Sequence, residues 1–222
     1  MTWLVACEES GAVRDALLGR GIDAVSCDLL PTASPGPHIQ GDVTDQLSKA
    51  WAGIIAFPDC TYLTCSAEWA YSDPNYRRYP GAGYHQKVKP GTLVGAARRA
   101  ARQQAIKFVL RIITSNRRVV IENPVGVLSR QIGRAQVIQP YMFGDDASKA
   151  TCLWIFGLPM LRVPDRGFWF PPRMVNGRPR WSNQTDSGQN RLSPGPYRAR
   201  DRSRTYPGIA KAIADLVEGV SK

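Results

Sequence analysis

The sequence predicts an α/β protein built on a doubly wound, mostly parallel sheet, with a small irregular lobe near its carboxyl end. Three observations predict this class. Short apolar runs alternate with amphipathic segments, which is typical of strands alternating with helices. The chain has 222 residues, enough for one such domain and a small appendage. Residues 159–196 are rich in Pro, Gly, Arg and Trp and show little period, which favours a lobe or a long surface loop.

The beginning of the chain predicts a strand, a helix and a second strand. Residues 2–7 (TWLVAC) are an apolar run, and residues 13–20 (VRDALLGR) have helical spacing before Gly21, a residue that commonly ends helices. Residues 24–27 (AVSC) form the second apolar run, and a proline-punctuated loop follows over 31–37. This order is that of a βαβ unit, in which the two strands run parallel.

The rest of the chain continues the alternation. Strands are predicted over 54–57, 118–122 and 150–156, an amphipathic helix over 93–113 and a closing helix over 206–220. Residues 73–90 have the composition of a mobile, basic loop. We therefore divide the chain into a main domain, residues 1–157 with 204–222, and a small basic lobe, residues 158–203.

The net charge of +11 is unevenly distributed along the chain. Residues 1–60 carry eight acidic side chains against three basic ones, whereas residues 77–118 carry eleven Lys or Arg and no acid. Residues 162–204 hold ten arginines against three aspartates, with Trp169, Trp181 and Tyr197 among them. Arginine suits phosphate and aromatic rings stack on bases, so this half predicts a nucleic-acid surface. The alternative, that the charge only aids solubility, stays open.

Neither a membrane segment nor a metal or disulfide framework is expected. No run approaches the roughly 18 apolar residues that span a bilayer, and Glu8 and Glu9 interrupt the opening before a signal-peptide core forms. The five cysteines are odd in number and lack a C-x-x-C pair, and only two histidines accompany them. A cytoplasmic protein is the expectation.

Chemically reactive side chains follow the predicted strands. Glu8, Ser10 and Gly11 follow the first strand, and Asp28 ends the second. Asp42 lies in a Gly-Asp-Val turn, Cys60 follows residues 54–57, and Glu122 and Asn123 follow 119–121. In a parallel sheet these positions share one edge, and an acid at the end of a second strand suits a ribose diol. Asp28 is therefore expected to bind a cofactor.

These residues resemble the motifs of S-adenosylmethionine-dependent DNA cytosine-5 methyltransferases, which have a Rossmann-like methyltransferase fold. Residues 57–61 (FPDCT) resemble that family's proline-cysteine loop, and residues 121–125 (IENPV) its Glu-Asn-Val motif. Residues 4–11, 27–28, 41–43 and 204–216 stand where its cofactor motifs would be, in the same order. The opening CEESGAVRDAL and the segment RWSNQTDSGQNR resemble phage- or prophage-encoded members, and a bacterial host cell would then be the setting.

The resemblance implies a role for each motif. Cys60 would add to C6 of a flipped cytosine, Glu122 would supply a proton or hydrogen bond at N3, and Asn123 would shape the loop. S-adenosyl-L-methionine would be held by Cys7, Glu8, Ser10, Gly11, Asp28, Asp42 and Pro58. Double-stranded DNA would be the partner, contacted by Arg77, Arg78, Lys149, Arg178, Arg180 and Arg191. The resemblance implies no metal, and the oligomeric state stays open.

Two departures from the family leave alternatives open. Asp59 replaces the second proline of Pro-Pro-Cys, and a carboxylate beside a thiol raises its pKa. The first loop has a single glycine, Gly11, after Glu8, Glu9 and Ser10. A catalytically silent homologue that binds nucleic acid is thus one alternative, and a pyrimidine C5 methyltransferase acting on RNA or nucleotide is another. Cys65 is the second choice of nucleophile, whereas Cys7, Cys27 and Cys152 lie in apolar strands and are expected in the core.

Overall fold

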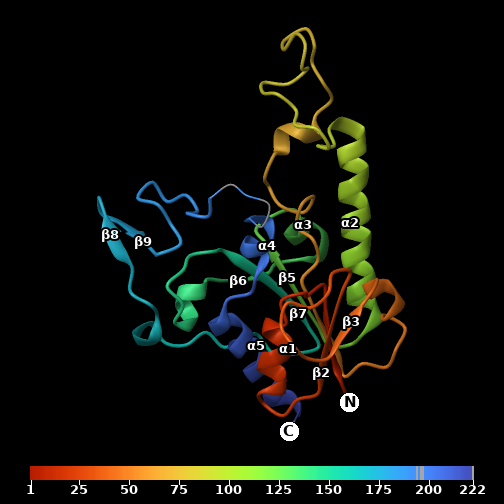
Figure 1. The fold of residues 1–222 in the computed structure, drawn as a ribbon, viewed down its shortest axis with the longest axis vertical. Coiled ribbons are helices and arrows are strands. Elements are labelled where there is room, and N and C mark those ends of the chain that lie inside the picture. Colours follow the sequence, from red (N-terminus) through yellow and green to blue (C-terminus); the bar gives the residue numbers. More distant parts are fainter. Residues whose placement is uncertain (194, 196–197, 222) are drawn as a thin grey trace.

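A seven-stranded sheet forms the centre of the computed structural model, which describes residues 1–193, 195 and 198–221 (Figure 1). The strand order is β3-β2-β1-β4-β5-β7-β6. Its strands are β1 (Trp3–Ala6), β2 (Ala24–Asp28), β3 (His38–Gln40), β4 (Gly53–Ala56), β5 (Val119–Pro124), β6 (Gln136–Ile138) and β7 (Thr151–Phe156). The helices are α1 (Ala12–Leu18), α2 (Gly95–Ser115), α3 (Leu128–Ile132), α4 (Arg198–Ser203) and α5 (Pro207–Ser221).

The sheet is mostly parallel, as the sequence predicts, with one exception. The first five strands in the order, β3 to β5, run parallel to their neighbours, but β7 is antiparallel to both β5 and β6. The strand predicted over 150–156 is present as β7, and the sequence pattern alone does not give its antiparallel direction. Only a short 3₁₀ helix, Pro140–Phe143, lies between β6 and β7, and a parallel neighbour would need a longer crossover connection.

Alternating side chains in the strands give the sheet two covered faces. In β1, Trp3 and Val5 belong to a core cluster with residues of α1 and α5, whereas Leu4 and Ala6 belong to a cluster with residues of α2 and α3. The period of two follows from strand geometry. Both faces are therefore buried, which explains why these strands read as continuous apolar runs.

In the described part of residues 158–203, regular structure is limited to a 3₁₀ turn, Arg166–Phe168, the helix α4, and the hairpin of β8 (Arg173–Val175) and β9 (Arg178–Arg180), which projects from the sheet (Figure 1). Trp181 packs this region onto the main domain: its ring is buried and stacks on Tyr141, with 4.1 Å between centroids. Trp181 is therefore part of the core and does not present its ring to a base, contrary to prediction. Tyr197 lies outside the described residues.

The segment between β4 and α2 forms an arm that extends past the amino end of α2 (Figure 1). Trp69 anchors it, with Tyr84 and His85 packed edge-on against the indole ring. The predicted basic loop, residues 73–90, forms the end of this arm. Among the described residues, no helix is both long and apolar enough to cross a membrane.

Candidate functional site

The loops that follow β1, β2 and β4 meet at the carboxyl edge of the sheet. The strand β1 lies between β2 and β4, which is the position where ligands bind in doubly wound sheets. Cys7, the first residue after β1, has a left-handed backbone with φ +57°. Burial and the nearby carboxylates of Asp28, Asp42 and Asp59 raise the pKa of Cys7 to about 12. The charges of these three acids, distant in sequence, thus all act on one position at the edge of the sheet.

Glu8 and Ser10 turn their side chains toward the start of α1. The Glu8 carboxylate is buried and accepts hydrogen bonds from the backbone N–H groups of Val13, at 2.6 Å, and Arg14, at 3.3 Å. The Ser10 hydroxyl accepts from the N–H of Ala12. Burial raises the pKa of Glu8 to about 7, although these hydrogen bonds oppose the rise. Both side chains therefore fold back from the first loop, and their oxygens accept hydrogen bonds from the N–H groups at the start of α1.

Arg14, a residue that the sequence reasoning did not select, binds the first loop to the loop after β2. Its guanidinium is fully buried and donates to the hydroxyls of Ser26 and Thr32 and to the carbonyl of Ser34. A Cβ on Gly11, which has φ +75°, would lie 2.3 Å from this guanidinium. Gly11 is therefore needed for close packing against Arg14. The one feature of the sequence that could have indicated a buried Arg14 is its position on the apolar face of a short predicted helix.

Asp28 is the last residue of β2, and Asp42 lies two residues after the end of β3. One oxygen of each carboxylate accepts a hydrogen bond from a nearby backbone N–H group. Asp28 accepts a hydrogen bond from the N–H of Leu30, and Asp42 accepts one from the N–H of Thr44. The Thr44 hydrogen bond holds the pKa of Asp42 below its usual value. Leu29, directly after Asp28, has 71% of its surface exposed. The edge therefore combines carboxylate acceptors with an apolar surface, the groups that a ribose and a purine ring require.

The proline-cysteine loop places Cys60 at the start of a tight turn. The Cys60 carbonyl accepts hydrogen bonds from the N–H groups of Leu63 and Thr64. Asp59 accepts from both the N–H and the hydroxyl of Thr61, at 3.0 and 2.8 Å. The acid that departs from the family motif thus helps to form the turn, and Cys60 itself is half-buried.

Asn123 connects β5 to this loop. Its side chain is buried and donates from Nδ2 to the Pro58 carbonyl at 2.8 Å, while its Oδ1 has no partner among the described residues. The structure therefore places the second predicted motif directly against the first, across 65 residues of sequence.

Cys60 and Glu122 interact electrostatically, and Lys149 acts on both. Burial raises the pKa of Cys60, and the charges of Asp59 and Glu122 raise it further. Burial also raises the pKa of Glu122. The Lys149 ammonium opposes both shifts. Lys149, predicted as a DNA contact, thus lies close enough to the thiol and the carboxyl to influence their protonation.

The other cysteines occupy different surroundings. Cys65 is exposed beyond the turn, whereas Cys27 and Cys152 are buried in strands, which confirms that these two belong to the core. All five thiols are free. Within the described part of the chain, no cluster of three or more His, Cys, Asp or Glu side chains could hold a metal ion.

The predicted DNA contacts fall in three places. Arg77 and Arg78 are exposed on the arm, and Lys149 lies beside Glu122. Arg180 and Arg191 line a hollow of about 370 Å³ beside the hairpin, while Arg178 is exposed on β9. Arg173, which the sequence reasoning did not select, also lines this hollow, and its guanidinium pairs with Asp186 at 2.6 Å. The hollow is completed by Asp146, Phe170, Pro171 and Ser182.

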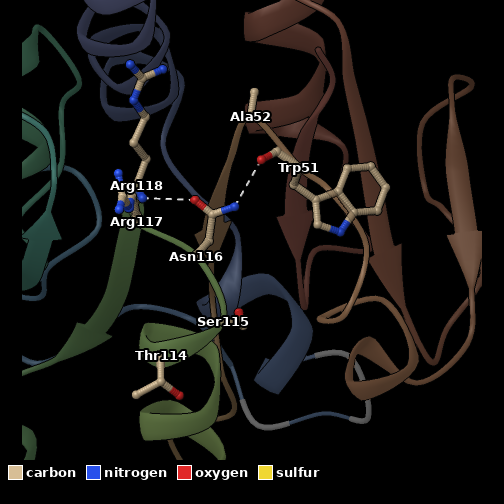
Figure 2. A pocket seen from close by; sticks show the side chains of 7 residues that line it. All are labelled: Trp51, Ala52, Thr114, Ser115, Asn116, Arg117 and Arg118. Carbon is tan, nitrogen blue, oxygen red and sulfur yellow. Dashed lines mark hydrogen bonds between the residues drawn. The ribbon is translucent and has the colours of Figure 1, made fainter.

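A second hollow, about 560 Å³, lies at the opposite edge of the sheet (Figure 2). It is lined near the amino ends of β4 and β5 by Trp51, Ala52 and residues 114–118. The Asn116 side chain donates to the Trp51 carbonyl and accepts from the N–H of Arg118 (Figure 2). It thus connects the residues that precede β4 with those that precede β5. This hollow contains none of the predicted site residues.

Comparison with protein-family models and with curated proteins finds no match to this chain.

Proposed function

We propose that the protein is a DNA (cytosine-5)-methyltransferase that uses S-adenosyl-L-methionine. The observation that carries the proposal is the hydrogen bond from Asn123 to the Pro58 carbonyl, because it brings the loop of Cys60 against the strand of Glu122. A thiol and a carboxylic acid that share this edge are the two groups that activation of a cytosine requires. The doubly wound sheet is compatible with such an enzyme.

The residues near β1 and β2 fit the cofactor. Asp28 and Asp42 offer carboxylate oxygens to the ribose hydroxyls and the adenine amino group, and Leu29 offers an apolar surface to the ring. The loop over residues 7–11 would face the methionine end, with Pro58 bordering it from the next strand. When bound, the cofactor supplies an electrophilic methyl group.

Cys60 and Glu122 would divide the activation of the base between them. The Cys60 thiolate forms a bond to C6, and the electron pair of the C5–C6 double bond then becomes available at C5. Burial raises the pKa of Glu122, which favours the protonated form of the carboxyl that would donate to N3 as negative charge develops there. After C5 is methylated, a solvent water takes the C5 proton, the C5–C6 double bond re-forms and Cys60 leaves as the thiolate.

The basic surfaces support a polymeric nucleic-acid substrate. Arg173, Arg180 and Arg191 converge on the hollow beside the hairpin, and Arg77 and Arg78 extend on the arm. Arginine binds phosphate through paired donors. Because a duplex hides C6 of cytosine, the target base must leave the stack to reach Cys60.

Asp59 favours a second candidate function, a catalytically silent protein that binds nucleic acid. Its charge raises the pKa of Cys60 after burial has already done so, which lowers the fraction of reactive thiolate. A third candidate, methylation of RNA or of a free pyrimidine nucleotide, keeps the same chemistry.

Methyl transfer from labelled cofactor separates the three candidates. The wild-type protein and the Cys60→Ala variant are incubated with duplex DNA, RNA or dCMP, and the labelled nucleoside is identified. We expect 5-methylcytosine in DNA with the wild type only, and Cys65→Ala as the matched control should remain active. Label in RNA or nucleotide would change the substrate, and no label in any of them would favour the silent protein.

A further inference from the structure

Arg102 of α2 contacts the turn that follows Cys60. Its Nε donates to the Tyr62 carbonyl at 2.9 Å, and its Nη2 donates to the Thr64 carbonyl at 3.3 Å. One guanidinium thus binds two carbonyls of the same turn. The forked, planar arrangement of arginine donors makes this contact directional.

Glu68 and Tyr71 of the arm fix the Arg102 guanidinium in place. The Glu68 carboxylate pairs with Nη2 at 2.6 Å, and the guanidinium carbon lies 3.4 Å from the centre of the Tyr71 ring. The Tyr71 hydroxyl donates to the Tyr62 carbonyl, the acceptor that Arg102 also uses. The Arg102 side chain is only 15% exposed, whereas the Glu68 side chain is 52% exposed, so the ring and carbonyl contacts are better shielded from solvent than the ion pair.

The segment after β5 holds the other side of the same turn. The N–H of Val127 donates to the Leu63 carbonyl at 2.8 Å, and Thr64 forms a β-bridge with Gly126. Together with the bond from Asn123 to Pro58, these contacts bracket Cys60 on both sides in the chain. The carbonyls of residues 62, 63 and 64 all accept from partners outside the turn.

We propose that Arg102 is a positioning residue that aligns the Cys60 thiol, an inference that rests on the proposed role of Cys60. Arg102 acts through the turn and touches neither the thiol nor the base. A displacement of about 1 Å of a reacting group can cost roughly 100-fold in rate. Without Arg102 this side of the turn keeps only the Tyr71 hydroxyl and loses both guanidinium contacts, so the thiol moves more freely and meets C6 less often in the reactive geometry.

The neighbouring Arg99 provides a matched control. It lies on the same helix and also contacts the arm, through the Tyr71 carbonyl at 2.7 Å and Asp73 at 2.9 Å. Among the described residues it has no hydrogen bond or ion pair with residues 60–64. Arg99→Gln therefore removes only a contact between α2 and the arm. Arg102→Gln also removes the contact between α2 and the turn after Cys60.

Two readouts test the proposal: steady-state kinetics, and alkylation of each cysteine by iodoacetamide followed by peptide mass spectrometry. In Arg102→Gln we expect kcat to fall about 10- to 100-fold with little change in KM for DNA. Cys60 should alkylate faster, while buried Cys27 and Cys152 stay protected and so report an intact fold. Arg102→Lys, which keeps the charge but not the fork, should not restore kcat, and Arg99→Gln should behave as wild type.

Unchanged kcat and unchanged Cys60 alkylation in Arg102→Gln would overturn the proposal, as would equal losses in Arg99→Gln. If Arg102→Gln does not fold, Glu68→Gln removes the carboxylate that orients the guanidinium and should give a smaller change in the same direction. A wild type that transfers no methyl group would refute the proposed function. The alkylation comparison would still decide whether Arg102 positions Cys60.

Discussion

Asp59 has two opposing effects on its neighbour Cys60. Its carboxylate accepts two hydrogen bonds from Thr61 and thereby forms the turn, yet its charge raises the pKa of the thiol. Glu122 raises that pKa as well, and Lys149 lowers it. The reactivity of Cys60 therefore depends on charges contributed by the loop after β4, by β5 and by the segment before β7.

Asp59→Asn separates the two effects. Asparagine retains a side-chain oxygen for Thr61 but removes the charge, so the pKa of Cys60 should fall toward its ordinary value and the thiolate fraction at neutral pH should rise. The pH dependence of Cys60 alkylation measures this directly. A pKa that stays the same or rises in the variant would contradict the electrostatic argument.

Glu8 predicts a pH dependence of stability. Its pKa is about 7 in the folded chain, against an ordinary value of 4.5, so the folded state binds more protons between those values. Stability from this group is therefore present below about pH 4.5 and falls as pH rises through 7. Urea unfolding across this pH range should show that the free energy of unfolding falls less in Glu8→Gln than in the wild type. The difference should be on the order of a few kcal/mol. Equal slopes would contradict the burial argument.

At the scale of elements, Gly126 allows the loop after β5 to touch the Cys60 turn. A Cβ there would lie 2.0 Å from the Leu63 carbonyl oxygen, which is backbone and cannot rotate away. The bridge between Thr64 and Gly126 depends on this approach. The two predicted motifs therefore need a glycine where their loops meet.

Gly126→Ala should destabilise the protein by about 1–3 kcal/mol and expose Cys60 to alkylation, because the two loops must separate. Denaturant unfolding and the alkylation rate are the measurements. The control is Gly41→Ala, since a Cβ at Gly41 would meet nothing within 4 Å. Equal stability of the two variants would show that the loops tolerate the displacement.

The elements that carry the candidate site could be predicted because each strand is an apolar run ended by a turn residue. β4 stops before Pro58, and β5 ends at Pro124, so the positions of Cys60 and Glu122 follow from local sequence. The strands β3 and β6 were missed because three residues show no usable period. The direction of β7 depends on the length of its connection, which local pattern does not encode.

The buried arginines were missed for a different reason. Arg14 is satisfied by Ser26, Thr32 and Ser34, and Arg102 by Tyr62 and Thr64. These partners are about 12 to 40 residues away along the chain. Sequence composition counts such residues as surface charge, whereas their actual role is to hold loops together.

At the scale of the whole molecule, the acidic first part and the basic later part of the sequence occupy different regions. Asp28 and Asp42 lie at the sheet edge, whereas Arg173, Arg180 and Arg191 gather around the hollow near the hairpin. The three arginines hold the pKa of Asp186 below its usual value, led by its hydrogen bond with Arg173. This distribution favours a phosphate backbone at the lobe and a small cofactor at the sheet.

DNA binding should accordingly be salt-dependent. Each phosphate contact contributes a slope of about −0.9 in a plot of log affinity against log salt. Arg191→Gln should flatten the slope by about that amount, whereas Lys211→Gln, an exposed charge on α5 outside the hollow, should leave it unchanged. Fluorescence anisotropy over a salt series gives both values. A slope unaffected by Arg191→Gln would exclude this hollow from the DNA surface.

Covalent trapping tests the central claim most directly. A duplex in which 5-fluorocytosine replaces cytosine is incubated with the protein and S-adenosyl-L-methionine. The adduct normally breaks down when the hydrogen at C5 is removed as a proton. A fluorine at C5 cannot be removed in this way, so the thiol that attacked C6 stays attached. We predict an adduct that resists denaturation, maps to Cys60 by peptide mass spectrometry and is lost in Cys60→Ala. A protein that binds this duplex but forms no adduct, or an adduct that maps to Cys65, would contradict the account.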